Sequence, residues 1–195
     1  MATTGIWKIE KRLDNVLDYT TNIEKTINSE YGKDSYYDLH NVIDYVEADY
    51  KTEKQFYVSG VNCNPKTALE EMTITKEQYG KTGGILGFHA FQSFAEGEVT
   101  PEQCHAIGVR LAEEMWGDRF EVVVSTHLNT NHYHNHFVIN SVSFKDGKRY
   151  YDKRETYAEL RRLSDSLCEE YGLSVIKEKP CRNSRINFAN YQKDN

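Results

Sequence analysis

Hydrophobic and polar residues along the chain follow two periods, one typical of strands and one typical of helices. Four stretches combine β-branched and aromatic residues in the way that buried strands do, and they cover residues 54–60, 84–94, 120–127 and 134–144. After the last of these, Asp146-Gly147 forms the turn of a hairpin into the short stretch KRYY. The pattern therefore predicts several strands, at least two of them joined by a tight turn.

Between the strands, helical spacing and start signals predict helices at residues 12–21, 36–49, 65–72, 101–117 and 156–172. Pro65 stands at a first helical position, where its missing N–H group costs nothing. Thr100 with Gln103, and Thr156 with Glu159, have the spacing of capping boxes. The helices are few and are mixed with hairpin-linked strands, so the pattern favours an α+β fold with a mainly antiparallel central sheet and flanking helices.

The length of 195 residues suits one substantial domain, which we expect to occupy residues 1–178, followed by a polar segment at 179–195 that would be truncated from a longer chain. No apolar run is long enough for a membrane span, and the first residues have no apolar signal region. The four cysteines form no CxxC pair, so they read as reduced thiols. These features predict a cytoplasmic protein without a membrane partner.

The net charge of −6 argues mildly against a protein that holds nucleic acid over its whole surface. The charge is unevenly distributed, because residues 141–195 hold 12 Lys and Arg against 9 Asp and Glu, a local balance of +3. A local basic groove is therefore compatible with the sequence.

The stretch HLNTNHYHNHFVIN, residues 127–140, holds four of the seven histidines. Alternate side chains of a strand share a face, so His134 and His136 point the same way. A hairpin through the loop LNTNHY places His127 opposite His134, where Cβ atoms lie about 5 Å apart. Three imidazoles then converge on one point and leave coordination positions open, as in catalytic metal sites.

Other histidines have less certain roles. His132 falls in the loop, where an orienting contact to a metal ligand is the preferred interpretation, although it could be a fourth ligand. His89 alternates on its own strand and could approach the same face, whereas His40 and His105 read as ordinary helix residues. There is no HExxH motif, so a zinc protease is disfavoured, and the pattern of a cupin is not clear.

At the level of whole motifs, HLNTNHYHNHFVINSV resembles the third motif of the conjugative relaxases, the MobP-like mobilisation nucleases of the HUH endonuclease superfamily. LDYTTNIEKT resembles the first motif, GILGFHAFQSFAEGEVTPEQC the second, and LSDSLCEEYGLSVI the helix and strand that close the domain. The likeness covers nearly the whole chain, and the ordered set is more specific than the histidine motif alone. It implies the relaxase fold, whose palm is similar to ferredoxin and RRM sheets.

The resemblance implies that His127, His134 and His136 bind a divalent ion and that Tyr19 is the nucleophile. The implied activity is site- and strand-specific nicking of single-stranded or hairpin DNA at a transfer origin through a 5′-phosphotyrosine intermediate, for the mobilisation of a plasmid or integrative element in a bacterial cytoplasm. Mg²⁺ or Mn²⁺ is expected to support activity, and Zn²⁺, Ni²⁺ or Co²⁺ also suits three imidazoles. An accessory relaxosome protein and a coupling protein are the implied partners. Asn129 departs from the Asp that the family usually has there, which affects how a ligand is oriented.

Several alternatives stay open from the sequence. Lys25, Arg154 and Arg182 are the expected phosphate contacts, although each could be a solvated charge. A rolling-circle replication initiator of the same superfamily would use a tyrosine after the histidine motif, and tyrosines 150, 151 and 157 stand there. A non-catalytic metal-bound DNA-binding module agrees with the acidic net charge and with Asn129, and an unrelated metallohydrolase is the remaining alternative.

Overall fold

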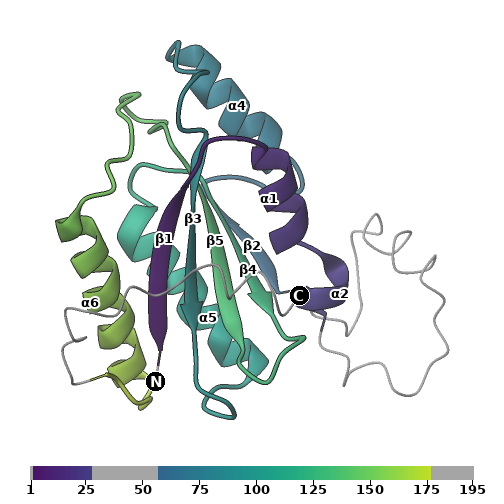
Figure 1. The fold of residues 1–195 in the computed structure, drawn as a ribbon, viewed down its shortest axis with the longest axis vertical. Helices are drawn as coiled ribbons and strands as arrows, with labels where there is room; N and C mark the ends of the chain where they lie inside the picture. Colours follow the sequence, from purple (N-terminus) through teal and green to yellow (C-terminus); the bar gives the residue numbers. More distant parts are fainter. Residues whose placement is uncertain (1, 28–56, 177–195) are drawn as a thin grey trace, which may run out of the picture.

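The computed structural model describes residues 2–27 and 57–176 and contains one five-stranded sheet (Figure 1). Its strands lie in the order β1-β3-β5-β4-β2, and each neighbouring pair is antiparallel. The strands are β1 Thr3–Ile9, β2 Val58–Val61, β3 Gly87–Ser93, β4 Val122–His127 and β5 His134–Asn140. With helices on both faces of this sheet, the expected α+β fold with a mainly antiparallel sheet is confirmed.

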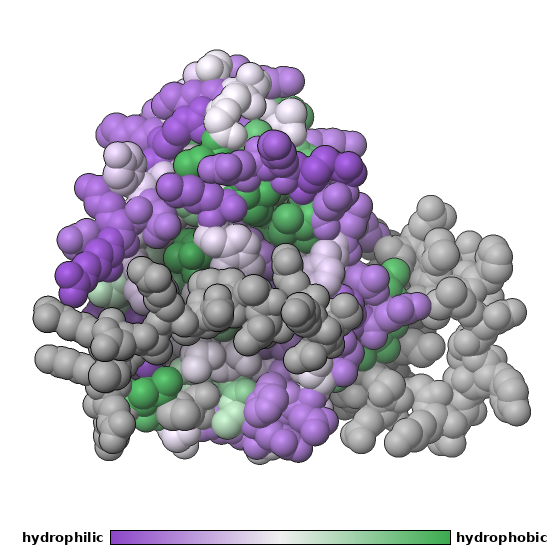
Figure 2. Space-filling view, in the orientation of Figure 1, coloured by the Kyte–Doolittle hydropathy of each residue, from purple (hydrophilic) through white to green (hydrophobic). Residues whose placement is uncertain are grey.

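The helices form two layers. On one face lie α5, Pro101–Trp116, and α6, Arg154–Glu170, which pack on each other and cover the larger hydrophobic cluster. On the other face lie α1, Leu13–Thr20, and α4, Ala68–Gln78, over a smaller cluster, with the one-turn helix α2, Ile23–Thr26, beside β4 (Figure 1). Apolar side chains show among hydrophilic ones on the face that carries α1 and α4 (Figure 2). Within residues 2–27 and 57–176, no helix combines the length and the apolar character that crossing a membrane requires.

The start of α5 matches the sequence pattern, while the start of α6 does not. The Gln103 N–H group donates to Thr100 Oγ1 at 3.2 Å and the Thr100 N–H group to Gln103 Oε1 at 3.1 Å, which is the predicted capping box. The box predicted at Thr156 is wrong, because α6 begins at Arg154 and the Thr156 hydroxyl accepts the N–H of Lys153 at 2.8 Å instead. The helix is still followed by Gly172, whose φ of +71° suits glycine.

Two other elements differ from the prediction. The helix after Pro65 is α4, which continues to Gln78 instead of ending near Met72, because Thr75 and Lys76 also face the interior. The sequence pattern missed β1 altogether, an edge strand whose one neighbour in the described sheet is β3.

The remaining boundaries shift by a few residues. Strand β2 begins at Val58, and the short α2 lies between two predicted helices, where no helix was predicted. The hairpin after β5 is reduced to an isolated bridge between Val142 and Arg149. The predicted helix at 36–49 and the polar segment at 179–195 lie outside the described residues.

Candidate metal centre

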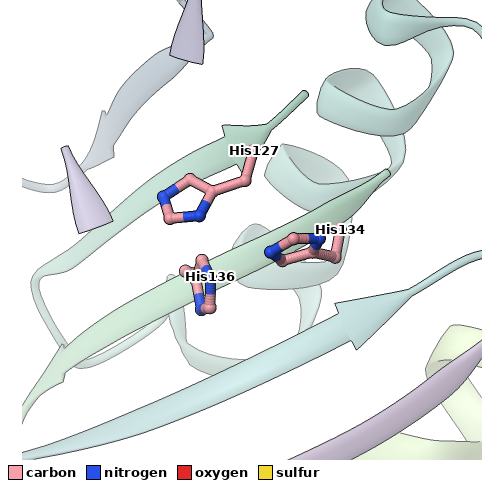
Figure 3. Close-up of side chains that lie close together, drawn as sticks. All are labelled: His127, His134 and His136. Carbon is pink, nitrogen blue, oxygen red and sulfur yellow. The ribbon is translucent and has the colours of Figure 1, made fainter. Parts of the chain in front are cut away.

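The pairing of β4 with β5 brings the three histidines together. His127 pairs with His134 and Ser125 with His136, which is the register expected from the sequence. Each residue offers one ring nitrogen, and the three nitrogens lie within 4.8 Å of one another. Figure 3 shows the three rings side by side on two adjacent strands, pointing toward a common point. We call His127, His134 and His136 the triad.

Each ring of the triad is held at its other nitrogen. His134 Nδ1 lies 2.9 Å from the backbone oxygen of His132, and His127 Nε2 lies 2.9 Å from that of Thr20. A carbonyl oxygen only accepts, so both nitrogens carry the proton and donate it. His136 Nδ1 lies 2.9 Å from His89 Nε2. Such outer contacts fix the tautomer of a metal-binding imidazole and orient its ring.

These contacts leave His136 Nε2 buried with no hydrogen-bond partner among the described residues. A buried polar atom without a partner costs about 1–3 kcal/mol, so its presence between two other ring nitrogens fits a site built for a cation. Burial lowers the pKa of His127 to about 4 and that of His136 well below its ordinary value, and it also lowers the pKa of His134. The triad is therefore neutral near pH 7, the form in which imidazole binds metals.

Tyr19, at the end of α1, lies beside the triad. Its ring centroid is 5.6 Å from that of His127 and 5.9 Å from that of His136, and 38% of the residue is exposed. The ammonium nitrogen of Lys25 lies 3.7 Å from the centroid of the Tyr19 ring. A phenol, a cation and three neutral imidazoles thus meet at one place, from three separate segments of the chain.

Backbone contacts explain how the α1–α2 segment reaches β4. The Thr20 carbonyl accepts from His127, and the Lys25 carbonyl accepts from the Leu128 N–H group at 2.8 Å. Burial lowers the pKa of Lys25 from its ordinary value. The role of the Thr20 carbonyl could not be found from residue type, because any residue supplies such an oxygen.

The residues expected to orient the triad differ in their positions. His89 contacts His136 through its ring, as the alternation along β3 suggested. His132 contributes its backbone oxygen, while its ring nitrogen Nδ1 lies 3.3 Å from the oxygen of Phe94. Asn129 is exposed in the loop between β4 and β5. A role for Asn129 or for the His132 ring therefore stays a prediction.

The residues expected to contact phosphate are Lys25, Arg154 and Arg182, and the two that the structure describes do not lie together. Lys25 lies at the triad, whereas Arg154 is the exposed first residue of α6, in the helix layer on the opposite face of the sheet from α1. Arg182 lies outside the described residues. Of the two described positions, Lys25 is the one that lies beside Tyr19.

Behind the triad, on the face that packs against α5, lies a polar residue that sequence reasoning missed. Asn135 stands between His134 and His136 and is fully buried. Its amide nitrogen donates to Gln92 Oε1 at 3.1 Å and to the Cys104 backbone oxygen at 2.8 Å. A polar residue at an inward position of a strand was the available signal.

The same network extends to two further elements. The Thr126 hydroxyl donates to Asn135 Oδ1 at 2.6 Å and lies 2.8 Å from His105 Nδ1, and His105 Nε2 lies 2.8 Å from the Ser59 hydroxyl. Gly108 of α5 passes so close that a Cβ there would lie 2.5 Å from the Asn135 amide nitrogen. Strand β5, which carries His134 and His136, is therefore fixed from behind by hydrogen bonds to β3, β4 and α5, and the network continues through His105 to β2.

Comparison with known proteins places this chain in a family. The model for the nuclease domain of MobA/VirD2-like relaxases matches residues 25–173, most of the chain. The chain therefore belongs to the relaxase family. The match includes the triad and begins six residues after Tyr19.

Relatives in two bacterial species agree with this assignment. A protein named Protein rlx from Staphylococcus aureus is 42% identical over 119 residues, 61% of this chain and 38% of the relative, and a second of that name is 38% identical over 141 residues, 72% of this chain and 42% of the relative. The group II intron-interrupted relaxase LtrB of Lactococcus lactis subsp. cremoris is 29% identical over 221 aligned positions, 93% of this chain and 38% of the relative. The chain thus spans about two fifths of the length of these relatives.

A solved structure supports the fold alone. It comes from a study of the molecular basis of vancomycin resistance transfer in Staphylococcus aureus and has a TM-score of 0.55 at 12% sequence identity. The similarity covers 90% of this chain and 96% of that one. The arrangement of sheet and helices is therefore shared with a solved protein of very different sequence.

Proposed function

We propose that this domain nicks one strand of DNA at a transfer origin, with Tyr19 as the nucleophile, in the conjugative mobilisation of a plasmid or integrative element. The observation that carries the proposal is the position of Tyr19, whose ring lies 5.6 Å from the His127 ring and beneath the Lys25 ammonium. An exposed nucleophile with a cation and a metal-binding group beside it is what phosphoryl transfer to a side chain needs.

In the proposed step, the phenol oxygen of Tyr19 attacks the phosphorus of one phosphodiester. A bond forms between this oxygen and phosphorus, and the bond from phosphorus to the 3′-oxygen breaks. The phenol gives up its proton and the released 3′-oxygen takes one up, so the products are a 5′-phosphotyrosine and a free 3′-OH. One phosphodiester replaces another, so the step is close to thermoneutral, reversible and independent of a nucleotide cofactor.

The triad is the group that would hold a divalent ion, as Mg²⁺ or Mn²⁺ in the active form, with Zn²⁺, Ni²⁺ or Co²⁺ as further ions that suit imidazole. When bound, such an ion polarises the non-bridging oxygens of a phosphate and stabilises negative charge there. The residues around it have their own tasks. His89 orients His136, Thr20 and His132 hold the other two rings through backbone oxygens, and Lys25 stabilises negative charge on the attacking oxygen and on the phosphate.

The proposed partner is single-stranded or hairpin DNA, met in the bacterial cytoplasm together with an accessory relaxosome protein and a coupling protein. Lys25 lies beside the nucleophile and is the best placed of the proposed phosphate contacts. Arg154 and Arg182 remain proposed contacts for DNA that extends farther from the triad. Phosphate contacts predict that binding weakens as salt rises.

The test is formation of a covalent protein–DNA adduct. The purified protein is incubated with single-stranded oligonucleotides that cover candidate transfer origins, with Mn²⁺ or with EDTA, and resolved on a denaturing gel. The proposal predicts a metal-dependent adduct that Tyr19→Phe abolishes, while Tyr151→Phe, a matched change at an exposed tyrosine on another part of the surface, retains it. An adduct that survives in Tyr19→Phe would move the nucleophile to another tyrosine, as in the rolling-circle alternative. Metal and DNA binding without any adduct would favour a non-catalytic binding module.

A further inference from the structure

Next to the triad, the same face of the sheet carries an aromatic surface that the proposed reaction does not use. Trp7 of β1 pairs with His89 of β3, and Phe91 of β3 pairs with His136 of β5. Directly paired residues of antiparallel strands share a face, so Trp7 and Phe91 lie on the face of the triad. We call Trp7 and Phe91 the aromatic platform.

The platform is continuous with the metal ligands through ring contacts. The Trp7 ring lies 4.3 Å from the His89 ring, centroid to centroid, and the His89 ring lies 5.0 Å from the His136 ring. Two ring-to-ring steps therefore join Trp7 to the triad. A ligand that occupies both places needs a negative group at the triad and a flat group close beside it.

The backbone of β1 is adapted to hold the platform. Trp7 and Phe91 have ring centroids 6.0 Å apart. At Gly5, a Cβ would lie 2.4 Å from Cε1 of Phe91, so the ring occupies the space that any other residue would fill. Gly5 is thus required for the Phe91 ring to lie against β1 beside Trp7.

The two tryptophans of the chain differ in their exposure. Trp116 is 1% exposed and belongs to the main hydrophobic cluster, whereas Trp7 is 37% exposed. Every nucleobase offers a flat π-face, and stacking of a base on an aromatic side chain contributes to binding for any base. An exposed indole beside a phosphate-binding group matches a base and a phosphate of the same short stretch of strand.

We propose that the aromatic platform stacks an unpaired base of the DNA strand whose phosphate lies at the triad. The inference rests on the proposed function and adds the side chains that hold a base in place. Trp7 supplies the exposed face of the stack, and Phe91 and His89 keep the indole in position. The platform binds an unstacked base without selecting for its identity.

Intrinsic fluorescence tests the proposal directly, because Trp116 is buried and Trp7 is exposed. A single-stranded oligonucleotide of a candidate transfer origin is titrated into the protein in EDTA, and tryptophan emission is recorded. The expected result is saturable quenching in the wild type that disappears in Trp7→Leu. Binding of DNA by anisotropy without any quenching would contradict the proposal, and absence of DNA binding would overturn the proposed function as well.

Affinity and salt dependence separate stacking from phosphate contacts. Trp7→Leu is expected to weaken binding about tenfold, while the slope of log affinity against log salt stays unchanged. Trp7→Phe should recover part of the affinity, and Tyr151→Leu, which removes an exposed aromatic elsewhere, should change neither quantity. Equal affinity of Trp7→Leu and wild type would refute the platform.

A scan of abasic sites along the oligonucleotide then identifies the stacked base. In the wild type, one abasic position is expected to weaken binding about as much as Trp7→Leu does. In Trp7→Leu the same abasic site should cause no further loss, because the stack is already absent. Additive losses at every position would show that no base depends on Trp7. If Trp7→Leu does not fold, the affinity of Trp7→Phe and the quenching in the wild type test whether a base stacks on Trp7.

Discussion

Strand β5 presents two faces with opposite properties. Toward α1 it presents His134 and His136, and toward α5 it presents Asn135 and Phe137. All four are buried, with His134 8% and Phe137 0% exposed. Asn135 has partners for both its amide nitrogen and its oxygen, whereas His136 Nε2 has none in residues 2–27 and 57–176.

The difference teaches that burial alone does not separate a residue that stabilises from one that acts. A buried group with all its partners stabilises the fold, because its hydrogen bonds replace those it lost with water. A buried group without a partner costs free energy in the empty protein, and such a cost persists where function requires it. The two faces therefore predict opposite results for neighbouring substitutions.

The largest expected loss of stability is that of Phe137→Ala, and the variant to compare with it is His136→Ala. Phe137 is fully buried with its ring centroid 5.6 Å from that of Trp116, so Phe137→Ala should lower the free energy of unfolding by about 3–5 kcal/mol. His136→Ala removes an unpaired buried nitrogen and should cost less, about 1–2 kcal/mol. Urea unfolding in EDTA measures both.

Metal affinity should show the reverse order. His136→Ala should weaken Co²⁺ or Mn²⁺ binding by at least about 100-fold in a competition titration, while folded Phe137→Ala keeps its affinity. A loss of affinity in both variants with equal loss of stability would mean that the two faces are not separable. A His136→Ala protein with wild-type affinity would remove this residue from the metal site.

The second contrast compares two asparagines. Asn135→Leu leaves the Gln92 oxygen, the Cys104 carbonyl and the Thr126 hydroxyl without their partner, so the free energy of unfolding should fall by about 3 kcal/mol or more. Asn129 is exposed in the loop, so Asn129→Leu should change stability by about 0.5 kcal/mol or less. Thermal unfolding of both variants checks the comparison.

The matched pair also tests what holds the triad in place. If the network behind β5 positions His134 and His136, Asn135→Leu should weaken metal binding in the molecules that remain folded, and Asn129→Leu should not. Equal metal affinity in Asn135→Leu and wild type would limit the network to a role in stability.

The sequence predicted the face that points to α1 better than the face that points to α5. Alternation along a strand and a short hairpin loop are local rules, so they were sufficient to place His127 opposite His134. The role of Asn135 was not found, because its inward strand position is the one local signal, and its partners come from β3, β4 and α5, which are distant in the sequence.

Distant contacts also explain why the sequence pattern did not predict strand β1 or the full length of helix α4. Strand β1 is an edge strand, and its pairing with β3 joins residues far apart in the sequence. The continuation of α4 to Gln78 depends on the burial of Thr75 and Lys76 against the rest of the domain, although both residue types usually face solvent. Tertiary contacts, not local preference, decide these boundaries.

The smallest expected effect concerns acid, and it compares His127 on the metal face with His105 on the helix face. Burial lowers the pKa of each to about 4. In the unfolded chain both titrate near their ordinary value of about 6.5, so between pH 6.5 and pH 4 the unfolded chain binds more protons and stability falls as pH falls. From pH 7 to pH 5.5 each histidine should account for about 1 kcal/mol of that loss.

In EDTA, His105→Gln and His127→Gln should therefore make the loss of stability from pH 7 to pH 5.5 smaller by a similar amount, about 1 kcal/mol each, in urea unfolding at the two pH values. An unchanged loss in His105→Gln would mean that the pKa of His105 is about the same in the folded protein as in the unfolded chain. Because burial lowers the two pKa values alike, acid sensitivity does not distinguish the faces of the sheet. Metal binding does distinguish the two faces. Added Co²⁺ should raise the stability of His105→Gln as it does in the wild type and have little effect on His127→Gln.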